Sequence, residues 1–208
     1  MKELKNPLII VANGEFPKHS IPLDKLNEAR TIIACDGAAD NLLNRDYSFD
    51  LIIGDLDSIS KGTLELFKNI IIRNEDQSSN DLRKAIDYAK SKGIKSISIL
   101  GATGKREDHS IGNIFSLLKY DNLDLKIYTD TGIFSIVNND EKIDSFKGQQ
   151  VSLFADDKTI KISSTNLKYN FNKCYSSSLF SGTLNESIGE NFTLKLSHGK
   201  ILLFQKFK

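Results

Sequence analysis

The sequence has few of the features that mark a disulfide-bonded, zinc-binding or membrane protein. Its 208 residues include two cysteines, Cys35 and Cys174, which lie far apart and lack the spacing of a metal site. We expect both to be reduced thiols in a cytoplasmic protein. The three histidines have no zinc-site spacing either. No apolar run approaches the roughly 20 residues that span a bilayer, and the first residues are too polar for a signal peptide.

The chain also lacks an excess of charge and several familiar catalytic motifs. It carries 28 basic and 27 acidic side chains, so its charge gives no reason to expect a nucleic-acid partner. The Gly-x-x-x-x-Gly-Lys-Ser/Thr loop of P-loop enzymes and the Gly-x-Gly-x-x-Gly loop of dinucleotide-binding proteins are both absent. No serine–histidine or cysteine–histidine hydrolase arrangement stands out.

Strands and helices alternate through the first part of the chain. Apolar runs predict strands at residues 8–12, 31–35, 51–53, 70–73, 96–100 and 125–129. Helices are expected between them, at residues 23–30, 38–44, 63–69, 80–92 and 108–120. This alternation is typical of a mainly parallel sheet with right-handed crossovers, covered by helices in a three-layer α/β domain.

After about residue 131 the pattern changes to short strands separated by turns. Strand-like runs occur at residues 133–137, 150–154, 159–162, 191–196 and 201–207. We therefore predict an α/β domain at residues 1–138, followed by a smaller all-β sandwich domain at residues 139–208.

Polar residues gather where the predicted parallel strands end. Asp36 follows one strand, Asp55 and Asp57 follow the next, and Asp81 and the segment 101–108 follow two more. Ligands of open α/β sheets bind beyond the carboxyl ends of the strands, so these groups are expected to line one pocket. Paired carboxylates suit Mg2+, and a glycine-rich loop that opens into a helix suits a phosphate group.

Each of these features also has a purely structural interpretation. Asp36 and Asn80 could cap helices, and the Asp-x-Asp pair could be a solvated loop. The segment 101–104 could be an ordinary turn, and Arg106 alone would be a surface charge. The joint placement of these features at four strand ends favours a Mg2+-nucleotide site that carries out phosphoryl or diphosphoryl transfer.

Four segments together resemble the thiamine pyrophosphokinase family. They are Cys35-Asp36-Gly37-Ala38-Ala39-Asp40, Ile53-Gly54-Asp55-Leu56-Asp57-Ser58, Asp76-Gln77…Asn80-Asp81-Leu82 and Gly101-Ala102-Thr103-Gly104-Lys105-Arg106-Glu107-Asp108-His109. In the second domain, Leu167-Lys168-Tyr169 and Gly182-Thr183-Leu184-Asn185-Glu186 are similar to two further family segments. The resemblance covers nearly the whole chain.

The resemblance implies a thiamine diphosphokinase. Such an enzyme transfers the diphosphoryl group of ATP to the hydroxyl of thiamine, with Mg2+, and works as a homodimer. The α/β domain would bind ATP and the β-sandwich would bind thiamine. The resemblance assigns Mg2+ to Asp55, Asp57 and Asp81, and a catalytic role to these three with Arg106 and Asp108. The remaining expected binding residues are Asp36, Gln77, Asn80, Gly101, Thr103, Tyr169, Thr183 and Asn185.

Three residues depart from the family pattern. Ser78 stands where the family usually has an aspartate, which removes one metal or water contact. Asn166 replaces a glycine, and asparagine tolerates a positive φ better than most residues do. Leu184 replaces a serine, so a hydrogen bond to the acceptor substrate would be lost and substrate choice could differ.

Two other functions remain open from the sequence. One is a different Mg2+-dependent diphosphotransferase or nucleotide-sugar enzyme with an Asp-x-Asp site, which a panel of alcohol acceptors would reveal. The other is a non-catalytic module that senses thiamine or a nucleotide, which would bind its ligand without turnover. The number of carboxylates at the strand ends favours an enzyme over a sensor.

Overall fold

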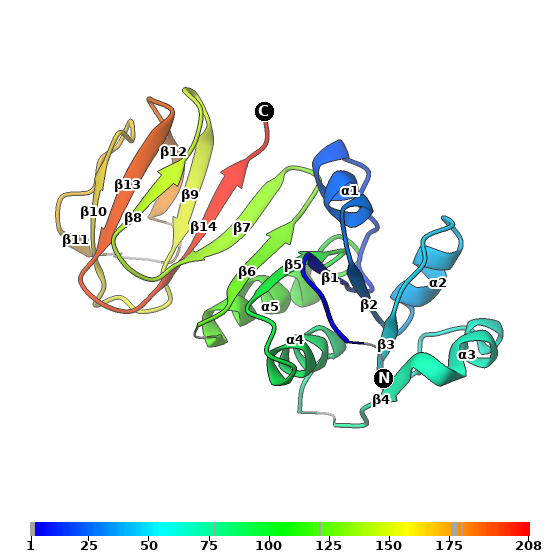
Figure 1. Cartoon of the computed structure of the whole chain (residues 1–208). Helices are drawn as coiled ribbons and strands as arrows, with labels where there is room; N and C mark the ends of the chain where they lie inside the picture. The colour runs from blue at the N-terminus through cyan, green and yellow to red at the C-terminus, as the bar shows by residue number, and fades with distance from the viewer. Residues whose placement is uncertain (1–2, 77, 121, 176–178, 180) are drawn as a thin grey trace. The chain divides into compact units, whose positions relative to one another are not determined.

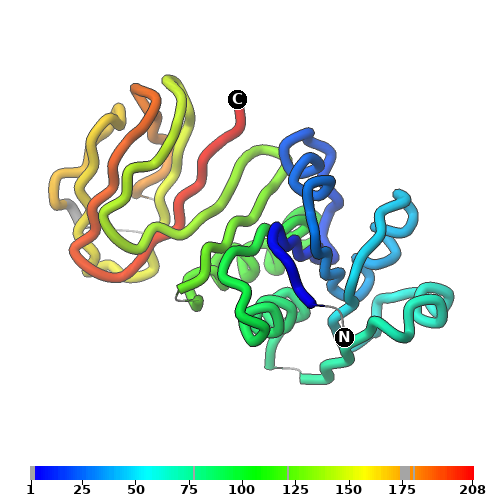
Figure 2. The backbone as a smooth tube through the Cα atoms, viewed as in Figure 1, coloured from blue at the N-terminus to red at the C-terminus, as the bar shows by residue number. Residues whose placement is uncertain are grey.

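A computed structural model describes residues 3–76, 78–120, 122–175, 179 and 181–208, which form two compact units (Figures 1 and 2). The first unit ends at Asp130, and the second comprises Thr131–Lys208 together with Leu117–Lys119. The predicted domain boundary, between residues 138 and 139, falls later. The strand β7 (Gly132–Val137) pairs with β14 (Ile201–Lys206) and therefore belongs with the second unit.

The first unit is built on parallel strands in the order β6-β5-β1-β2-β3-β4. The strands are β1 (Leu8–Val11), β2 (Thr31–Cys35), β3 (Leu51–Gly54), β4 (Ile71–Arg73), β5 (Ser96–Leu100) and β6 (Asp124–Tyr128). The helices are α1 (Ser20–Asn27), α2 (Ala38–Leu43), α3 (Lys61–Phe67), α4 (Asp81–Ser91) and α5 (Glu107–Ser116), with a short 3-10 helix at Lys68–Ile70. A second 3-10 helix, Leu117–Lys119, belongs to the second unit.

The central strands form the core of this unit. Every residue of β1, β2 and β3 is buried, and most are aliphatic. Strands that are covered on both faces have this continuous apolar character, because both sets of side chains must avoid water. The helix α4 contributes a buried stripe to the same core, which includes Leu82, Ala85, Ile86 and Ala89, as its helical spacing predicts.

The strand order reverses direction at β1. The chain moves outward from β1 to β2, β3 and β4, and then returns to β5 on the other side of β1. Right-handed crossovers then place α1 to α3 on one face of the sheet and α4 and α5 on the other. A reversal of this kind opens a crevice beyond the carboxyl ends of the strands, where ligands bind in such folds.

Several helix boundaries differ from the sequence prediction, among them both ends of α1, both ends of α3 and the end of α5. The helix α1 begins at Ser20, earlier than the predicted residue 23, because the side chain of His19 accepts a hydrogen bond from the Ile21 N–H and caps the helix. Histidine is not among the preferred capping residues, so the type of this residue does not mark the start of the helix. At its other end α5 changes to a 3-10 turn after Ser116, within the predicted helix 108–120.

The second unit is a sandwich of antiparallel sheets. One sheet contains β12-β9-β14-β7 and the other β11-β10-β13-β8. Besides β7 and β14, the strands are β8 (Glu141–Asp144), β9 (Gln150–Phe154), β10 (Lys161–Thr165), β11 (Cys174–Tyr175), β12 (Gly182–Glu186) and β13 (Asn191–Leu196). Phe192, Leu194, Ile201 and Leu203 are prominent in the buried core of this unit.

The predicted fold class is confirmed: an α/β domain precedes a smaller β-sandwich. The sequence did not predict β8, β11 or β12. The strands β8 and β12 contain charged and turn-forming residues such as Glu141, Asp144 and Asn185, which obscure a short strand. Within the described residues, every helix is too short or too polar to cross a bilayer.

Candidate active site

A cavity of about 670 Å³ opens in the first unit beyond the carboxyl ends of the central strands. This volume is within the usual range for a small-molecule site. Its wall is made by Ala12, Asn13, Gly14, Cys35, Asp36, Asp55, Asp57, Ser58, Ser79, Asn80, Asp81, Leu82, Arg83, Lys84, Ala102, Thr103, Lys105, Arg106, His109, Ser110 and Asn113. The expectation that separate strand ends contribute to one pocket is therefore met.

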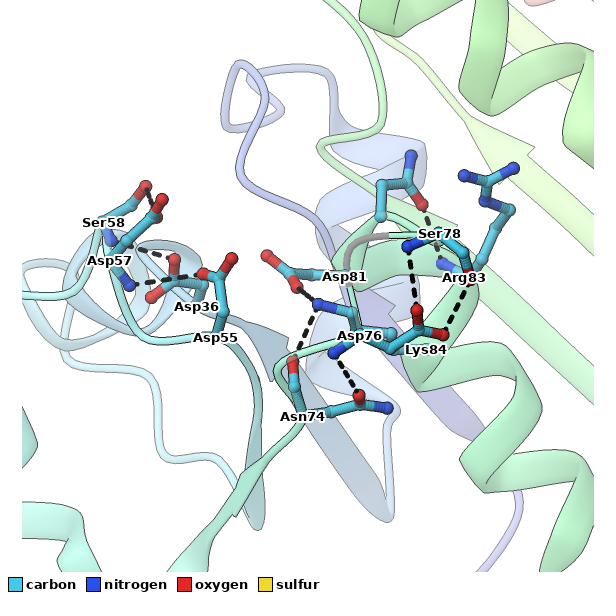
Figure 3. Close-up of polar contacts among 11 residues, drawn as sticks. Asp36, Asp55, Asp57, Ser58, Asn74, Asp76, Ser78, Asp81, Arg83 and Lys84 are labelled. Atoms are coloured by element: carbon cyan, nitrogen blue, oxygen red, sulfur yellow. Dashed lines mark hydrogen bonds and ion pairs between the residues drawn. The ribbon is translucent and has the colours of Figure 1, made fainter.

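Three carboxylates form a cluster in this wall. Asp36, Asp55 and Asp57 each offer an oxygen that lies within 4.8 Å of those of the other two (Figure 3). The donors are all carboxylate oxygens, which is the ligand type that Mg2+ and other hard cations prefer. From the sequence we expect Asp55, Asp57 and Asp81 to hold the metal. Asp36 lies with Asp55 and Asp57 in this cluster, and Asp81 lines the same cavity and pairs with a lysine.

Asp36 organises the loop that carries the other two carboxylates. Its side chain is buried, and its two oxygens accept hydrogen bonds of 3.0 Å from the backbone N–H groups of Ser58 and Ile59. The pKa of Asp36 is raised to about 6, mainly by burial and also by the nearby Asp57 and Asp81, while the hydrogen bond from the Ser58 N–H opposes the shift. Asp36 also has a φ of 44°, so its backbone is held in the left-handed region.

Strand register explains why Asp36 lies where it does. Cys35 pairs with Ile53, so Asp36 follows β2 where Gly54 completes β3. A Cβ atom on Gly54 would lie 2.9 Å from the Cβ of Asp36 and 3.2 Å from the Cγ of Asp81. Only a glycine allows both carboxylates to approach the end of β3 this closely.

Asp81 is held by a buried lysine. The Lys84 ammonium donates to Asp81 Oδ1 at 3.0 Å and to the Asn74 carbonyl at 2.8 Å (Figure 3). Burial raises the pKa of Asp81, the positive charge of Lys84 opposes this, and the negative charges of Asp55 and Asp57 add to it. Asp81 therefore keeps a stronger affinity for a proton than an exposed aspartate does.

The glycine-rich loop packs tightly against the turn that follows β1. The Gly14 N–H donates to the Gly101 carbonyl at 2.7 Å, and the Glu15 N–H donates to the Thr103 carbonyl at 2.8 Å. Gly101 has a φ of 63°, and a Cβ there would lie 2.5 Å from the Ala12 carbonyl oxygen. Thr103 lines the cavity, whereas Gly101 lies outside its lining and permits the close approach of the two loops.

Two asparagines connect this loop to α4. Asn80 caps α4 by accepting from the Arg83 N–H, and its Nδ2 donates to Asn113 Oδ1 at 2.8 Å. Asn113 Nδ2 donates in turn to the Ala102 carbonyl, also at 2.8 Å. The predicted binding residue Asn80 therefore lies in the wall of the cavity and helps to fix its shape.

Arg106 and Asp108 form an ion pair with each other. Arg106 Nη2 lies 2.6 Å from Asp108 Oδ2, and both side chains are largely exposed. The arginine lowers the pKa of Asp108 to about 2, and the carboxylate raises the pKa of Arg106. Arg106 lines the cavity, and Asp108 lies outside the lining.

Two family models match the chain in succession. The model of the thiamin pyrophosphokinase catalytic domain matches residues 23–129, and the model of the thiamin pyrophosphokinase substrate-binding domain matches residues 132–204. The chain belongs to the thiamine pyrophosphokinase family. The cavity lies within the unit that corresponds to the catalytic-domain model.

Curated thiamine pyrophosphokinases and solved structures agree with this assignment. Thiamine pyrophosphokinase 1 of Oryza sativa subsp. japonica is 27% identical over 147 residues, which cover 59% of this chain and 55% of the rice protein. Thiamine pyrophosphokinase 1 of Arabidopsis thaliana is 26% identical over 154 residues, which cover 62% of this chain and 57% of the Arabidopsis protein. The chain thus spans little more than half the length of these curated relatives.

The solved structures show the same fold over nearly the whole chain. Thiamine pyrophosphokinase from Bacillus subtilis has a TM-score of 0.79 at 19% identity and covers 97% of this chain and 99% of that one. Yeast thiamin pyrophosphokinase has a TM-score of 0.78 at 17% identity, and the match covers 96% of this chain and 86% of the yeast chain.

The thiamine pyrophosphokinase motifs of the second unit occupy its surface. Asn185 is buried, and its amide donates to the Tyr169 carbonyl and accepts from the Tyr169 N–H. The Tyr169 side chain is exposed, and so is Leu184, which has a φ of 60°. Thr183 is partly buried beside them in β12. Asn185 therefore shapes this surface through the backbone of Tyr169.

The residues that depart from the family pattern have defined local roles. Asn166 has a φ of 61°, in the left-handed region that asparagine tolerates better than most residues do. Ser78 donates both its N–H and its hydroxyl to Asp76, at 2.8 and 2.9 Å. Gln77, an expected substrate contact, lies outside the described residues.

Several cavity residues were not singled out from the sequence. Lys84 follows Asp81 by three positions on α4, a spacing that brings side chains together on a helix and could have identified it. Asn113 is a buried polar residue within a predicted helix, which is a signal of a fixed hydrogen-bond role. Asn13, which directly follows the predicted strand at residues 8–12, accepts from Lys105 at 3.0 Å.

Proposed function

We propose that this protein is a thiamine diphosphokinase that transfers the diphosphoryl group of ATP to the hydroxyl of thiamine and releases AMP. The observation that carries the proposal is the oxygen-only cluster of Asp36, Asp55 and Asp57 in the wall of the cavity. The match of this region to the catalytic-domain model supports the same reaction.

The carboxylate cluster fits Mg2+ as the resident metal. Asp55 and Asp57 would hold it, with Asp36 as the third ligand, since these oxygens already lie close together. When bound, Mg2+ would neutralise phosphate charge and orient the leaving group. Thr103, Asn80 and Asp81 lie in the wall of the same cavity, where ATP would bind.

The residues of this chain then position the substrates and receive a proton. The thiamine hydroxyl oxygen forms a bond to the β-phosphorus, and the bond from that phosphorus to the oxygen shared with the α-phosphate breaks. The hydroxyl proton needs an acceptor. Asp81 suits this role better than Asp108, because burial raises the pKa of Asp81 whereas Arg106 lowers that of Asp108.

The other parts of the proposal rest on family resemblance. We expect a homodimer in the cytoplasm, with the exposed Tyr169 and the neighbouring Thr183 and Asn185 on the side that recognises thiamine. Arg106 would contribute positive charge to the cavity, in competition with its pairing to Asp108. Size-exclusion chromatography with light scattering would test the dimer.

The deciding experiment measures AMP and thiamine diphosphate formed from ATP, Mg2+ and thiamine by the purified chain. We expect stoichiometric formation of both products, and little AMP when thiamine or Mg2+ is omitted. Tight binding of thiamine or ATP without any product would instead identify a sensor. Turnover with a different alcohol from a panel of acceptors, and none with thiamine, would identify another diphosphotransferase.

A further inference from the structure

Within the described residues, two residues of the cavity wall each carry a buried side-chain atom without a hydrogen-bond partner. Across the described residues, the buried side-chain nitrogens and oxygens without a partner are Ser79 Oγ and Arg83 Nε. Both residues line the cavity. Buried polar groups are nearly always hydrogen-bonded, so two unpaired ones in the wall of one cavity indicate a group that binds there.

Arg83 also differs from the other cations that line the cavity. Lys84 donates to Asp81, Lys105 donates to Asn13, and Arg106 pairs with Asp108. The hydrogen bond that Arg83 donates comes from its backbone N–H, to Asn80 Oδ1. Within the described part of the chain, the buried Nε of Arg83 has no hydrogen-bond partner, so its N–H is left for a ligand.

The chemistry of these two groups defines what they can bind. An arginine side chain is always charged and only donates hydrogen bonds, and a serine hydroxyl can donate one. A cation would be repelled by Arg83, whereas a phosphoryl oxygen carries negative charge and accepts several hydrogen bonds. Ser78, in place of the aspartate usual in the family, leaves the neighbouring segment less negative and so more favourable to an anion.

The position of Arg83 complements the acidic cluster. Figure 3 shows Asp36, Asp55 and Asp57 on one side of Asp81 and the Arg83 side chain on the other. The cavity therefore offers carboxylates for a cation in one part of its wall and hydrogen-bond donors for an anion in another. A metal-bound polyphosphate has both kinds of group.

We propose that Ser79 and Arg83 form a phosphoryl-binding subsite at the start of α4. This subsite holds a phosphate group of the bound substrate or product that the carboxylate cluster does not hold. This inference rests on the proposed function for its choice of ligand. It adds two residues that no family motif identified in this sequence.

The test measures dissociation constants by calorimetry in Mg2+ for ATP, ADP, AMP, inorganic diphosphate, thiamine diphosphate and thiamine. The variants are Arg83→Met, which removes the charge and Nε–H, Arg83→Lys, which keeps the charge alone, and Ser79→Ala. Arg30→Met is the matched control. Arg30 is exposed and directly precedes β2, so it lies at the amino ends of the strands and the cavity lies at their carboxyl ends. Circular dichroism melts establish that each variant is folded.

We expect Arg83→Met to raise the dissociation constant of each ligand whose phosphate occupies the subsite by about 10-fold or more, because a hydrogen bond to a charged group is lost. Arg83→Lys should recover part of this loss, and Ser79→Ala should show a smaller one. A double variant that carries Ser79→Ala and Arg83→Met should lose less affinity than the product of the two single fold-losses, because both residues contact one group. Thiamine binding and the Arg30→Met variant should be unchanged.

The ligand series identifies the source of the phosphate. A loss for ATP and ADP but not AMP assigns the subsite to the β- or γ-phosphate, and a loss for thiamine diphosphate alone assigns it to the product. Unchanged constants for every phosphate ligand, or no phosphate binding by the unaltered protein, would overturn the proposal. So would an equal loss for thiamine, which would indicate a general distortion. The activity assay is separate: an inactive but phosphate-binding protein would defeat the proposed function and leave this subsite standing.

Discussion

The two units of this protein use their polar side chains differently. In the first unit, Asp36 and Asp81 are carboxylates whose pKa is raised by burial in the wall of a cavity. In the second unit, Asn185 is 3% exposed and bonds the backbone of Tyr169, while the side chains of Tyr169 and Leu184 are 63% and 88% exposed. The first unit places carboxylates together in a cavity wall. The second unit exposes an aromatic and an aliphatic side chain, and the backbone at Tyr169 is held by hydrogen bonds.

This difference suggests a division of labour between the units. Clustered carboxylates that share a cavity favour cation binding and proton transfer. Exposed aromatic and aliphatic groups on a rigid strand favour recognition of a partly apolar molecule. Substitutions in the first unit should therefore change the rate of the reaction, and substitutions in the second should change the affinity for the acceptor.

Apart from removal of a cluster carboxylate, the largest effect is expected from Gly54→Ala. The added methyl group would meet Asp36 at 2.9 Å and Asp81 at 3.2 Å, so both carboxylates must move. A displacement of about 1 Å at a reacting site can reduce a rate by roughly 100-fold, and we expect a loss of that size in kcat for AMP formation.

Gly62→Ala is the matched control for this substitution. Gly62 lies in α3, where a Cβ would meet nothing within 4 Å. Alanine in a helix should leave kcat unchanged and raise the free energy of unfolding by up to about 1 kcal/mol. Equal kcat values for Gly54→Ala and the unaltered protein would show that the positions of Asp36 and Asp81 do not matter for the reaction.

An intermediate effect is expected from pH, through Asp36. Its pKa is about 6 in the folded protein against an ordinary value of 3.8, so the native state binds this proton more tightly than the unfolded chain does. The resulting stabilisation is present below pH 3.8 and is lost as the pH rises to about 6. Asp36→Asn removes this titration.

Urea unfolding at several pH values without Mg2+ would measure this effect. Other carboxylates titrate in the same range, so the informative quantity is the difference in unfolding free energy between the unaltered protein and Asp36→Asn. This difference should change in favour of Asp36→Asn as the pH rises from 3.8 to about 6. A difference that stays constant over this interval would show that Asp36 has an ordinary pKa.

The smallest effect is expected in the second unit, from Leu184→Ser. Leu184 is exposed, so the unfolding free energy should stay within roughly 0.5 kcal/mol of the original. We expect KM for thiamine to change by less than about 10-fold, with kcat and KM for ATP unaltered. A large fall in kcat would contradict the assignment of this surface to recognition.

The sequence predicted the parallel part of the fold well, because its signals are local. Apolar runs such as residues 51–53, followed by a glycine and carboxylates, indicate a buried strand and the polar edge beyond it. The strands β8 and β12 were missed because their residues, such as Glu141 and Asn185, have weak strand preference and are ordered by pairing with distant strands.

The sequence indicates several residues of the candidate site but not how close to one another they lie. Asp55 and Asp57 were found from their spacing, but the closeness of Asp36 to them depends on the register of β2 against β3. The contact of Lys84 with the Asn74 carbonyl and the unpaired Nε of Arg83 depend on how the start of α4 packs. No local pattern in the chain encodes these tertiary contacts.

The central claim is that the carboxylate cluster of the first unit holds the metal needed for diphosphoryl transfer. The most direct test is AMP formation from ATP and thiamine over a range of Mg2+ concentrations for Asp55→Ala and Asp57→Ala, with folding checked by circular dichroism. We predict that both variants stay folded and lose about 1,000-fold or more in rate, whatever the Mg2+ concentration. Full activity in both variants would contradict the account.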